Sequence, residues 1–255
     1  MQDHVAENRR YWNEYAPQWV AAGEREWAAR SPYWGMWRIP QSEVPLLPDE
    51  MGQVNAIELG CGTGYISAWM QRRGAAVTAI DNSENQLATA RRLAAEHGIE
   101  DIEWIHGNAE DVPKPDGSYG FAISEYGASI WCDPTVWIPE AHRLLVPGGR
   151  LVMLGNSPIA SICTPLGGEN VDLRLHRSYF DLGRMDWTEV EIDPGGVEFN
   201  LSISGWFKLF HDTGFTVDNY LELRAPADNT DTLFAISGEW ARQYPSEHVW
   251  MLHKE

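Results

Sequence analysis

The feature that most limits how this chain can fold is a glycine-rich turn between a short apolar segment and a helical one. The turn is Gly60-Cys61-Gly62-Thr63-Gly64, and the apolar segment before it is 54–59. Glycine permits tight turns and lets the backbone approach a ligand closely. Free N–H groups at the start of the following helix attract a negative or electron-rich group. Together these elements indicate a nucleotide-like ligand at the carboxyl end of a parallel strand.

The segments on both sides of this turn alternate between strand and helix patterns. Such alternation is typical of a parallel sheet covered by helices on both faces. We therefore expect an α/β fold, Rossmann-like and doubly wound, with a mostly parallel seven-stranded sheet. The expected strands are 54–59, 76–80, 102–106, 119–124, 150–154, 215–223 and 248–253, and the expected helices are 65–73, 84–97, 135–145, 204–213 and 236–244.

Two segments fall outside this alternation. Residues 1–50 are rich in aromatic side chains and begin with a helical pattern over 5–23, so we expect a helical and aromatic cover segment there. Residues 51–255 form the expected main domain, with a loop-rich insertion at about 157–200, after the fifth strand. Neither segment has the pattern of a strand in the main sheet.

Composition narrows the class of partner. The formal net charge is −18, and an acidic surface repels phosphate backbones, which disfavours DNA or RNA. Three cysteines without a CxxC pair favour neither a disulfide framework nor a zinc site, so no metal is expected. The sequence shows no signal-peptide pattern and no apolar run long enough to span a bilayer. A cytoplasmic protein without a membrane partner is therefore the expectation.

An acidic residue follows the second expected strand. Asp81 comes about 20 residues after the first glycines, where a carboxylate can accept hydrogen bonds from both hydroxyls of a ribose. A helix cap is the alternative role, because Asn82 and Ser83 come next. A dinucleotide fold usually shows G-x-G-x-x-G, whereas the glycines here are at 60, 62 and 64 with Tyr65 at the next position. Both a mononucleotide-type and a dinucleotide-type ligand remain open on these residues alone.

Four motifs in order resemble a known family. Glu58-Leu59-Gly60-Cys61-Gly62-Thr63-Gly64 resembles the first motif of the class I S-adenosylmethionine-dependent methyltransferases. Asp81 is similar to that family's ribose-binding acid, and Asn108-Ala109-Glu110 resembles the segment beside the adenine. Leu145-Val146-Pro147-Gly148-Gly149-Arg150-Leu151 resembles the turn and fifth strand after the post-catalytic helix. The resemblance covers about 55–153 well, and the strands after 215 more loosely.

The resemblance implies S-adenosyl-L-methionine as the cofactor and S-adenosyl-L-homocysteine as its product. Glu58 would hold the positive methionine end, the glycine N–H groups would meet the carboxylate, and Asp81 would bind the ribose. A surface salt bridge is the alternative role for Glu58. The expected cofactor contacts are Glu58, Gly60, Cys61, Gly62, Gly64, Tyr65, Asp81, Asn82, Gln86, Asn108, Ala109, Glu110 and Glu125.

The end of the fourth strand is where this family often faces the transferred methyl group. Enzymes that methylate amino groups or adenine often carry Asn or Asp-Pro-Pro-Tyr/Phe there, whereas this chain has Ser124-Glu125-Tyr126-Gly127. This difference also disfavours DNA as the acceptor. Methyl transfer to a good nucleophile needs little beyond alignment and charge placement, so an obvious general base is not required. The expected catalytic residues are Tyr126, Glu125 and His176, with Tyr179 and His211 as weaker candidates for a base or anchor.

Aromatic residues are expected to shut water out of the site. The cover segment and the insertion lie where related small-molecule methyltransferases place substrate covers, and aromatic faces attract cations. A hydrophobic clamp without ligand contact is the alternative. The expected substrate contacts are Tyr11, Tyr15, Trp34, Trp37, Tyr126 and His176. Trp34→Ala is expected to weaken ligand binding and leave the fold intact.

The leading hypothesis is an enzyme that transfers a methyl group to a small molecule by direct in-line displacement. The first alternative is a non-catalytic regulatory protein that binds the same cofactor, and the second is an NAD-dependent enzyme. The glycine spacing and Asn108-Ala109-Glu110 disfavour the second alternative. The protein is expected to be a monomer or a homodimer with a small-molecule substrate and no nucleic-acid partner.

Overall fold

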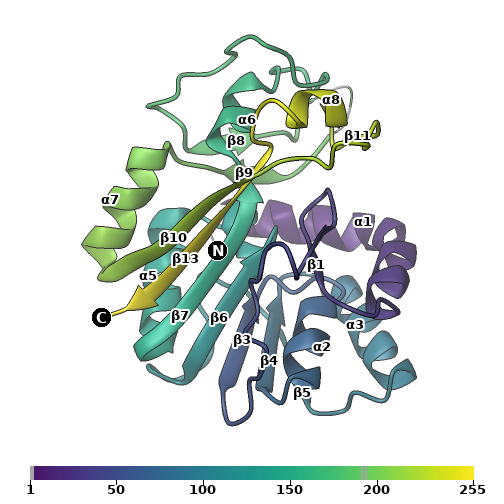
Figure 1. Ribbon diagram of the computed structural model, residues 1–255, viewed down its shortest axis with the longest axis vertical. Helices are drawn as coiled ribbons and strands as arrows, with labels where there is room; N and C mark the ends of the chain where they lie inside the picture. The colour runs from purple at the N-terminus through teal and green to yellow at the C-terminus, as the bar shows by residue number, and fades with distance from the viewer. Residues whose placement is uncertain (1–2, 191, 193) are drawn as a thin grey trace.

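The main sheet of the protein has seven strands in the order β10-β13-β7-β6-β3-β4-β5 (Figure 1). This computed structural model describes residues 3–190, 192 and 194–255. Six strands of this sheet run in the same direction, and β13 runs opposite to them, because it pairs antiparallel with both β7 and β10. The expected α/β fold with a mostly parallel sheet is therefore confirmed. The strands are β3 (Asn55–Leu59), β4 (Ala76–Asp81), β5 (Ile102–His106), β6 (Tyr119–Glu125), β7 (Leu145–Asn156), β10 (Phe215–Leu223) and β13 (Glu247–Lys254).

Helices cover both faces of the sheet because its strands are apolar on both sides. On β3, Ala56 belongs to the core shared with α2 (Tyr65–Arg72) and α3 (Glu84–Glu96). Ile57, the next residue, belongs to the core shared with α5 (Pro134–Leu144) and α7 (Ile203–Thr213). Successive side chains of a strand point to opposite faces, which explains this division. Helix α1 (Asp3–Trp27) packs against α3 and α2.

Local signals set where several of these helices start and end. The Ser83 hydroxyl accepts from the N–H of Gln86 at the start of α3, and Asp133 caps α5 in the same way through Thr135. Such caps satisfy N–H groups that have no partner inside the helix. Gly214 ends α7 with a left-handed backbone at φ 94°. The helix and strand ranges expected from the sequence are therefore close to those observed over 54–156.

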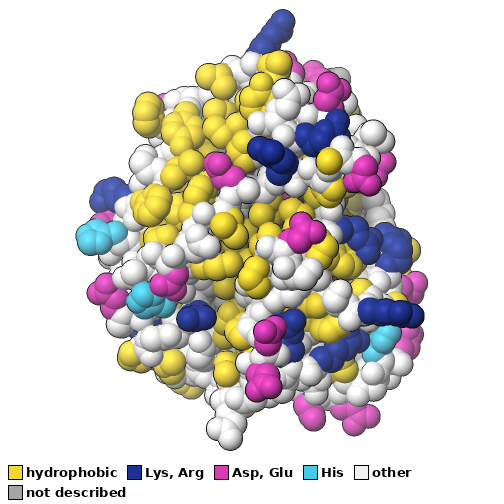
Figure 2. Space-filling model, in the orientation of Figure 1, with side chains coloured by type: hydrophobic (Ala, Val, Ile, Leu, Met, Phe, Trp, Pro, Cys, Tyr) yellow, Lys and Arg dark blue, Asp and Glu magenta, His cyan; other side chains and the backbone are white. Residues whose placement is uncertain are grey.

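The insertion is more ordered than its composition indicated. It contains α6 (Pro158–Cys163) and a hairpin of β8 (Arg184–Asp186) and β9 (Val197–Phe199). Above the sheet, α6, β8 and β9 lie near α8 (Gly238–Ala241) and β11 (Thr232–Leu233) (Figure 1). Figure 2 shows hydrophobic side chains gathered over this upper part of the molecule. The insertion leaves Leu173, Leu175 and Phe180 largely exposed.

The helix expected at 236–244 is wrong in extent. Only Gly238–Ala241 is helical, because Ile236 and Ser237 form β12 (Ile236–Ser237) and pair with β11. Phe234 and Ala235 adopt positive φ values of 48° and 61° and make the turn between these strands. Helix α4 (Ala128–Trp131) and the hairpin of β1 (Tyr33–Trp34) and β2 (Ile39–Pro40) were not expected. All are short elements stabilised by tertiary contacts rather than by periodicity.

One buried side chain joins the cover segment to the insertion. The Asn8 amide donates to the carbonyls of Trp131 and Val197 at 2.9 and 2.8 Å, and its Oδ1 accepts from the Val197 N–H at 2.7 Å. Asn8 is 3% exposed, so water does not compete for these bonds. Helices α1 and α4 and strand β9 are thus fixed to one another. No helix among the described residues is long and apolar enough to cross a membrane.

Trp34 has a structural role, which corrects the expectation that it contacts the ligand. Its side chain is completely buried in the core, and its indole N–H donates to Gln41 Oε1 at 3.1 Å. The same Gln41 oxygen accepts from the N–H groups of Leu46 and Leu47. Trp34 therefore stabilises the connection between β1 and the main sheet.

We expect Trp34→Ala to lower the free energy of unfolding by about 3–5 kcal/mol, because it leaves a large cavity in a packed core. Urea unfolding followed by circular dichroism measures this loss. Phe180→Ala is the control, because Phe180 is 83% exposed. An unchanged unfolding midpoint for Trp34→Ala would contradict the structural role.

Candidate functional site

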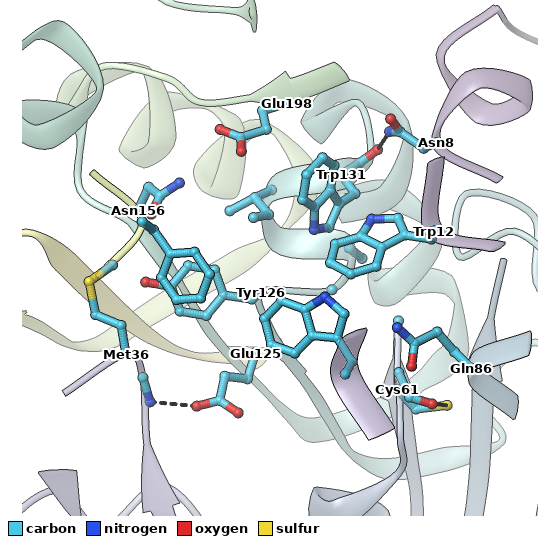
Figure 3. A pocket seen from close by; sticks show the side chains of 18 of the residues that line it. Asn8, Trp12, Met36, Cys61, Gln86, Glu125, Tyr126, Trp131, Asn156 and Glu198 are labelled. Atoms are coloured by element: carbon cyan, nitrogen blue, oxygen red, sulfur yellow. Dashed lines mark hydrogen bonds between the residues drawn. The ribbon is translucent and has the colours of Figure 1, made fainter. Parts of the chain in front are cut away.

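A cavity of about 690 Å³ lies at the carboxyl ends of β3, β4 and β6. The glycine-rich turn and the strand ends form its floor, and α1 and the insertion form its roof. Figure 3 shows polar side chains such as Glu125, Gln86 and Glu198 together with indole rings around this space. Its volume falls in the range of pockets that enclose a drug-sized molecule.

The glycine-rich turn is shaped by positive φ angles and a close contact. Gly60 and Gly62 have φ values of 80° and 52°. A Cβ on Gly60 would lie 2.6 Å from the Cα of Gly127, so a larger residue would push the turn away from β6. A Cβ on Gly62 would meet nothing within 4 Å. The turn therefore presents bare backbone to open space in the cavity.

Asp81 holds this turn in place from the neighbouring strand. Its Oδ2 accepts from the N–H of Gly62 at 2.7 Å, and its Oδ1 accepts from the N–H of Ser83 at 2.8 Å. Burial raises the pKa of Asp81, while these backbone donors act in the opposite direction. The carboxylate also lines the cavity, where it has further lone pairs for a ligand's hydroxyl groups.

Glu58 is a buried carboxyl beside the turn. It is 2% exposed, and its Oε2 accepts from the N–H of Ser67 at 2.8 Å and from the Ser67 hydroxyl. These contacts cap the first turn of α2, whose N-cap residue Gly64 has no side chain to do so. Burial raises the pKa of Glu58 to about 8. A positively charged group in the cavity would favour the ionised form.

Gln86 contributes a polar atom without a protein partner. Its Oε1 is buried and makes no hydrogen bond with the described residues, although the side chain lines the cavity (Figure 3). A buried polar atom without a partner costs free energy, so its presence indicates a ligand or water that supplies one. Asn82, Asn108 and Ala109 line the same end of the cavity.

Glu125 and its neighbours form a second polar group at the floor. Its Oε1 accepts from the N–H of Gly35 at 2.6 Å, and its Oε2 accepts from the Tyr65 hydroxyl. Burial raises the pKa of Glu125 to about 7. Glu26 on α1 also has a pKa raised to about 7, first by burial and then by the charge of Glu125. Arg38 is the nearby cation, and its guanidinium stacks over Tyr33 at 4.1 Å.

Tyr126 lines the cavity, but its hydroxyl has a protein partner. The residue has a positive φ of 52°, and its hydroxyl donates to Glu247 Oε1 at 2.7 Å. Glu247 is fully buried, its Oε1 also accepts from the N–H of Met36, and its Oε2 has no partner among the described residues. Burial raises the pKa of Tyr126 well above its usual value, so its hydroxyl stays protonated. The expected role of Tyr126 as a base is therefore corrected to that of a wall residue.

Several expected site residues lie away from the cavity. His176 bonds Asp172 at 2.9 Å in the insertion, so its expected catalytic and substrate roles are corrected. Glu110 pairs with His4 and accepts from the N–H of Asp133, so it points away from the cavity that Asn108 and Ala109 line. Two further expected contacts do not line the cavity. Gly64 packs against Trp104, and the Tyr15 ring stacks on the Tyr11 ring, with the ring centroids 4.4 Å apart.

Trp34 and the weaker candidates also lie elsewhere. Trp34 is buried in the core, the Tyr179 hydroxyl accepts from the N–H of Ile203, and His211 lies on α7.

The remaining expected residues do come together. Each is expected from the sequence to contact a cofactor or substrate, and each lines the one cavity: Tyr11, Trp37, Glu58, Gly60, Cys61, Gly62, Tyr65, Asp81, Asn82, Gln86, Asn108, Ala109, Glu125 and Tyr126.

Sequence reasoning missed part of the roof. Trp12 and Trp131 line it, and their ring centroids are 5.1 Å apart. Trp19, which belongs to the aromatic segment expected to cover the site, lines it too. The spacing of Asn8, Trp12 and Trp19 along one helix was a signal for this face. Asn156 lines the roof from the end of β7, and Trp187 and Glu198 line it from the insertion. Nothing in the local sequence singled out Trp187 and Glu198, because the β8–β9 hairpin brings them to the cavity.

The central part of the chain is similar to known methyltransferases. A family model described as "Methyltransferase domain" matches residues 57–153. A demethylmenaquinone methyltransferase from Listeria monocytogenes is 33% identical over 106 residues, which is 40% of this chain and 45% of that protein. The chain thus spans about half the length of the curated relatives that it matches.

Solved structures share the fold over nearly the whole chain at low identity. One is a putative S-adenosylmethionine dependent methyltransferase from Listeria monocytogenes, with a TM-score of 0.68, 16% identity, and coverage of 92% of this chain and 99% of that one. A second is geranyl diphosphate C-methyltransferase from Streptomyces coelicolor, with a TM-score of 0.67, 16% identity, and coverage of 100% of this chain and 98% of that one. A third is the [4+2]-cyclase SpnF, with a TM-score of 0.64, 17% identity, and coverage of 96% of this chain and 95% of that one. Likeness of fold alone therefore fixes no reaction.

The ligand-free protein is expected to lose stability as the pH rises from about 5 to about 8. Burial raises the pKa of Glu247 to about 8 from its usual value of 4.5. Between these values the unfolded chain has lost a proton that the folded protein keeps, so unfolding becomes easier by ~1.4 kcal/mol per pH unit for such a carboxyl. Urea unfolding at a series of pH values measures the slope.

Glu247→Gln is the matched test, because glutamine keeps an acceptor for Tyr126 and Met36 but does not titrate. The slope in this variant is expected to be less steep by ~1.4 kcal/mol per pH unit between about pH 5 and 7. Glu189→Gln, at an exposed position, is expected to keep the original slope. Equal slopes for Glu247→Gln and the unchanged protein would show that Glu247 is not buried as a neutral acid.

Proposed function

We propose that this chain is a class I S-adenosylmethionine-dependent methyltransferase that binds S-adenosylmethionine in its cavity and methylates a small-molecule acceptor by direct in-line displacement; the match to the methyltransferase domain and the similar relatives support this. One observation carries the proposal. The glycine-rich turn, Asp81 and the 108–109 segment, which are separate motifs in the sequence, surround one end of a single cavity. The rest of the cavity is lined by indole rings and the roof carboxyl Glu198, and it leaves space for a second ligand.

The residues at the floor fit the proposed cofactor. S-adenosylmethionine supplies an activated methyl group on a positively charged sulfur. Asp81 is suited to the ribose hydroxyls, and the bare backbone at Gly62 leaves room for a ligand to approach. The unpartnered Gln86 oxygen would gain a donor, and Asn108 offers an amide for the adenine edge. Glu58 and Glu125, with pKa values raised by burial, favour a positively charged neighbour.

The chain's own contribution to the reaction is alignment, charge and exclusion of water. Direct displacement depends on holding two molecules in line and on placing charge, so it requires no general base. The aromatic roof from α1 and the insertion covers the space over the floor, which protects a reactive donor from water. Tyr126 supports the acceptor as a wall residue, because its hydroxyl is held by Glu247.

Two other functions give different outcomes in simple measurements. A regulatory protein would bind S-adenosylmethionine and S-adenosylhomocysteine but transfer no methyl group. An NAD-dependent enzyme would be stabilised against heat by NAD rather than by S-adenosylhomocysteine. A thermal-shift comparison of these ligands separates the NAD enzyme from the other two functions.

We expect Asp81→Asn to weaken S-adenosylhomocysteine binding about 10- to 100-fold, because hydrogen bonds to a charged group contribute about 1.5–3 kcal/mol. Isothermal titration calorimetry measures the affinity, and circular dichroism checks the fold. Asp101→Asn, an exposed aspartate outside the cavity, is the control. Equal affinity in Asp81→Asn would remove Asp81 from the proposed site.

The activity itself is tested by labelled methyl transfer. The protein is incubated with S-adenosylmethionine carrying an isotopic methyl label and with a small-molecule extract of its source cells. We expect label to appear in a metabolite, with loss of most transfer in Asp81→Asn at limiting cofactor. Tight S-adenosylhomocysteine binding without labelled product would favour the regulatory protein instead.

A further inference from the structure

Glu198 is a carboxyl of the roof that the proposed chemistry does not use. It lies on β9 and lines the cavity from the insertion. Figure 3 shows it across the cavity from Glu125 and Cys61, which belong to the floor. Its position thus sets it apart from the residues suited to the cofactor.

We propose that Glu198 binds a cationic nitrogen of the methyl acceptor, so that the substrate class is organic amines with an apolar body. The proposal rests on the proposed function, because it assigns the second ligand of that same cavity. Three observations support it: the surroundings of the carboxyl, the aromatic rings beside it and the balance of charge in the cavity.

The surroundings of Glu198 leave its charge largely unneutralised. Burial raises its pKa to about 7, although the side chains of Trp187 and Asn156 and the charge of Arg177 act to lower it. Arg177 donates to the carbonyls of Ser161 and Thr164 and stacks over Trp187 at 4.7 Å. The Arg177 guanidinium thus hydrogen-bonds the backbone of the insertion rather than the Glu198 carboxylate. A cationic ligand would supply the positive charge that the surroundings of Glu198 lack.

Indole rings line the cavity together with Glu198. Trp12, Trp131 and Trp187 line the cavity with it, and Trp12 meets Trp131 edge to face. An ammonium group near the face of a tryptophan is attracted by the ring, and more strongly where water is excluded. Rings together with one carboxylate are suited to an amine with an apolar body, whereas a purely apolar acceptor would bury the carboxylate further without supplying a positive charge.

The charge of the cavity lining disfavours an anionic acceptor. Glu26, Glu125, Glu198 and Asp231 line the space together with only two arginines, Arg25 and Arg38. Arg38 stacks over Tyr33, and Arg25 is exposed on α1. An anion would have to approach these carboxyls within a chain whose net charge is −18. A cation, in contrast, is attracted both by these carboxyls and by the net negative charge of the chain.

The test compares three ligands with the same ring system and different charges: tryptamine, tryptophol and indole-3-propionate. Calorimetry is run with and without saturating S-adenosylhomocysteine. We expect tryptamine to bind at least about tenfold more tightly than the other two, a difference of ~1.4 kcal/mol. Glu198→Gln is expected to remove this preference, and Glu189→Gln, exposed on the same insertion, is expected to keep it.

The pH dependence gives a second readout that a structural role would not produce. Glu198 is faced by Arg177 from the insertion and by Tyr126 from the end of β6, and both keep their charge state near neutral pH. An aliphatic amine also stays protonated there. Tryptamine affinity is therefore expected to rise as the pH rises through about 7. The rise is expected to be smaller in Glu198→Gln, where only the more distant cavity carboxyls Glu26 and Glu125 still have pKa values of about 7.

The outcomes separate this proposal from the proposed function. Equal or tighter binding of tryptophol or indole-3-propionate, no binding of tryptamine, or an unchanged preference in Glu198→Gln would each overturn the amine assignment. Failure of S-adenosylhomocysteine to bind would overturn the proposed function alone, because the ligand series is also run without it. In the labelled-transfer assay, a labelled product that a cation exchanger retains supports the proposal, and a neutral or anionic product contradicts it.

Discussion

The contact between the Asp81 carboxylate and the Gly62 N–H holds the functional end of this molecule together. It connects the turn after β3 to the end of β4, and the second oxygen of Asp81 fixes the start of α3 through Ser83. The backbone conformation of the turn is available only because Gly60 and Gly62 adopt positive φ angles at little cost. The floor of the cavity, the start of α3 and the proposed ribose site therefore all depend on the Asp81 carboxylate. A substitution of Asp81 affects all three.

The second organising constraint is the burial of carboxyl groups without matching cations. Glu58, Glu125, Glu198 and Glu247 all have pKa values raised by burial, and none forms an ion pair within the described residues. Such groups cost stability in the empty protein. Glu58, Glu125 and Glu198 line the cavity, where the positively charged ligands proposed above would offset part of this cost, whereas Glu247 lies outside the cavity.

Sequence reasoning predicted the floor well and the roof poorly. The floor follows from local rules: apolar strands, a glycine-rich turn and capped helices fix where Glu58, Asp81 and Asn108 lie. The roof depends on long-range packing. Nothing near Glu198 in the sequence predicts that a short hairpin carries it to the cavity, and a buried core tryptophan such as Trp34 has the same local pattern as a ligand-binding one. His176 was misassigned because the path of the loop after α6 keeps it out of the cavity lining, where it bonds Asp172, four residues earlier in the chain.

The buried Asn8 amide has a consequence for how fast molecules exchange with the cavity. Because it joins α1 to β9 and to the end of α4, the two halves of the roof cannot swing apart independently. Separating α1 from α4 and β9 would break all three of these bonds at a buried position, where the freed polar groups would lack partners. A molecule that passes between α1 and β9 therefore has to wait until the Asn8 contacts break, so this one side chain influences how long a ligand stays in the cavity.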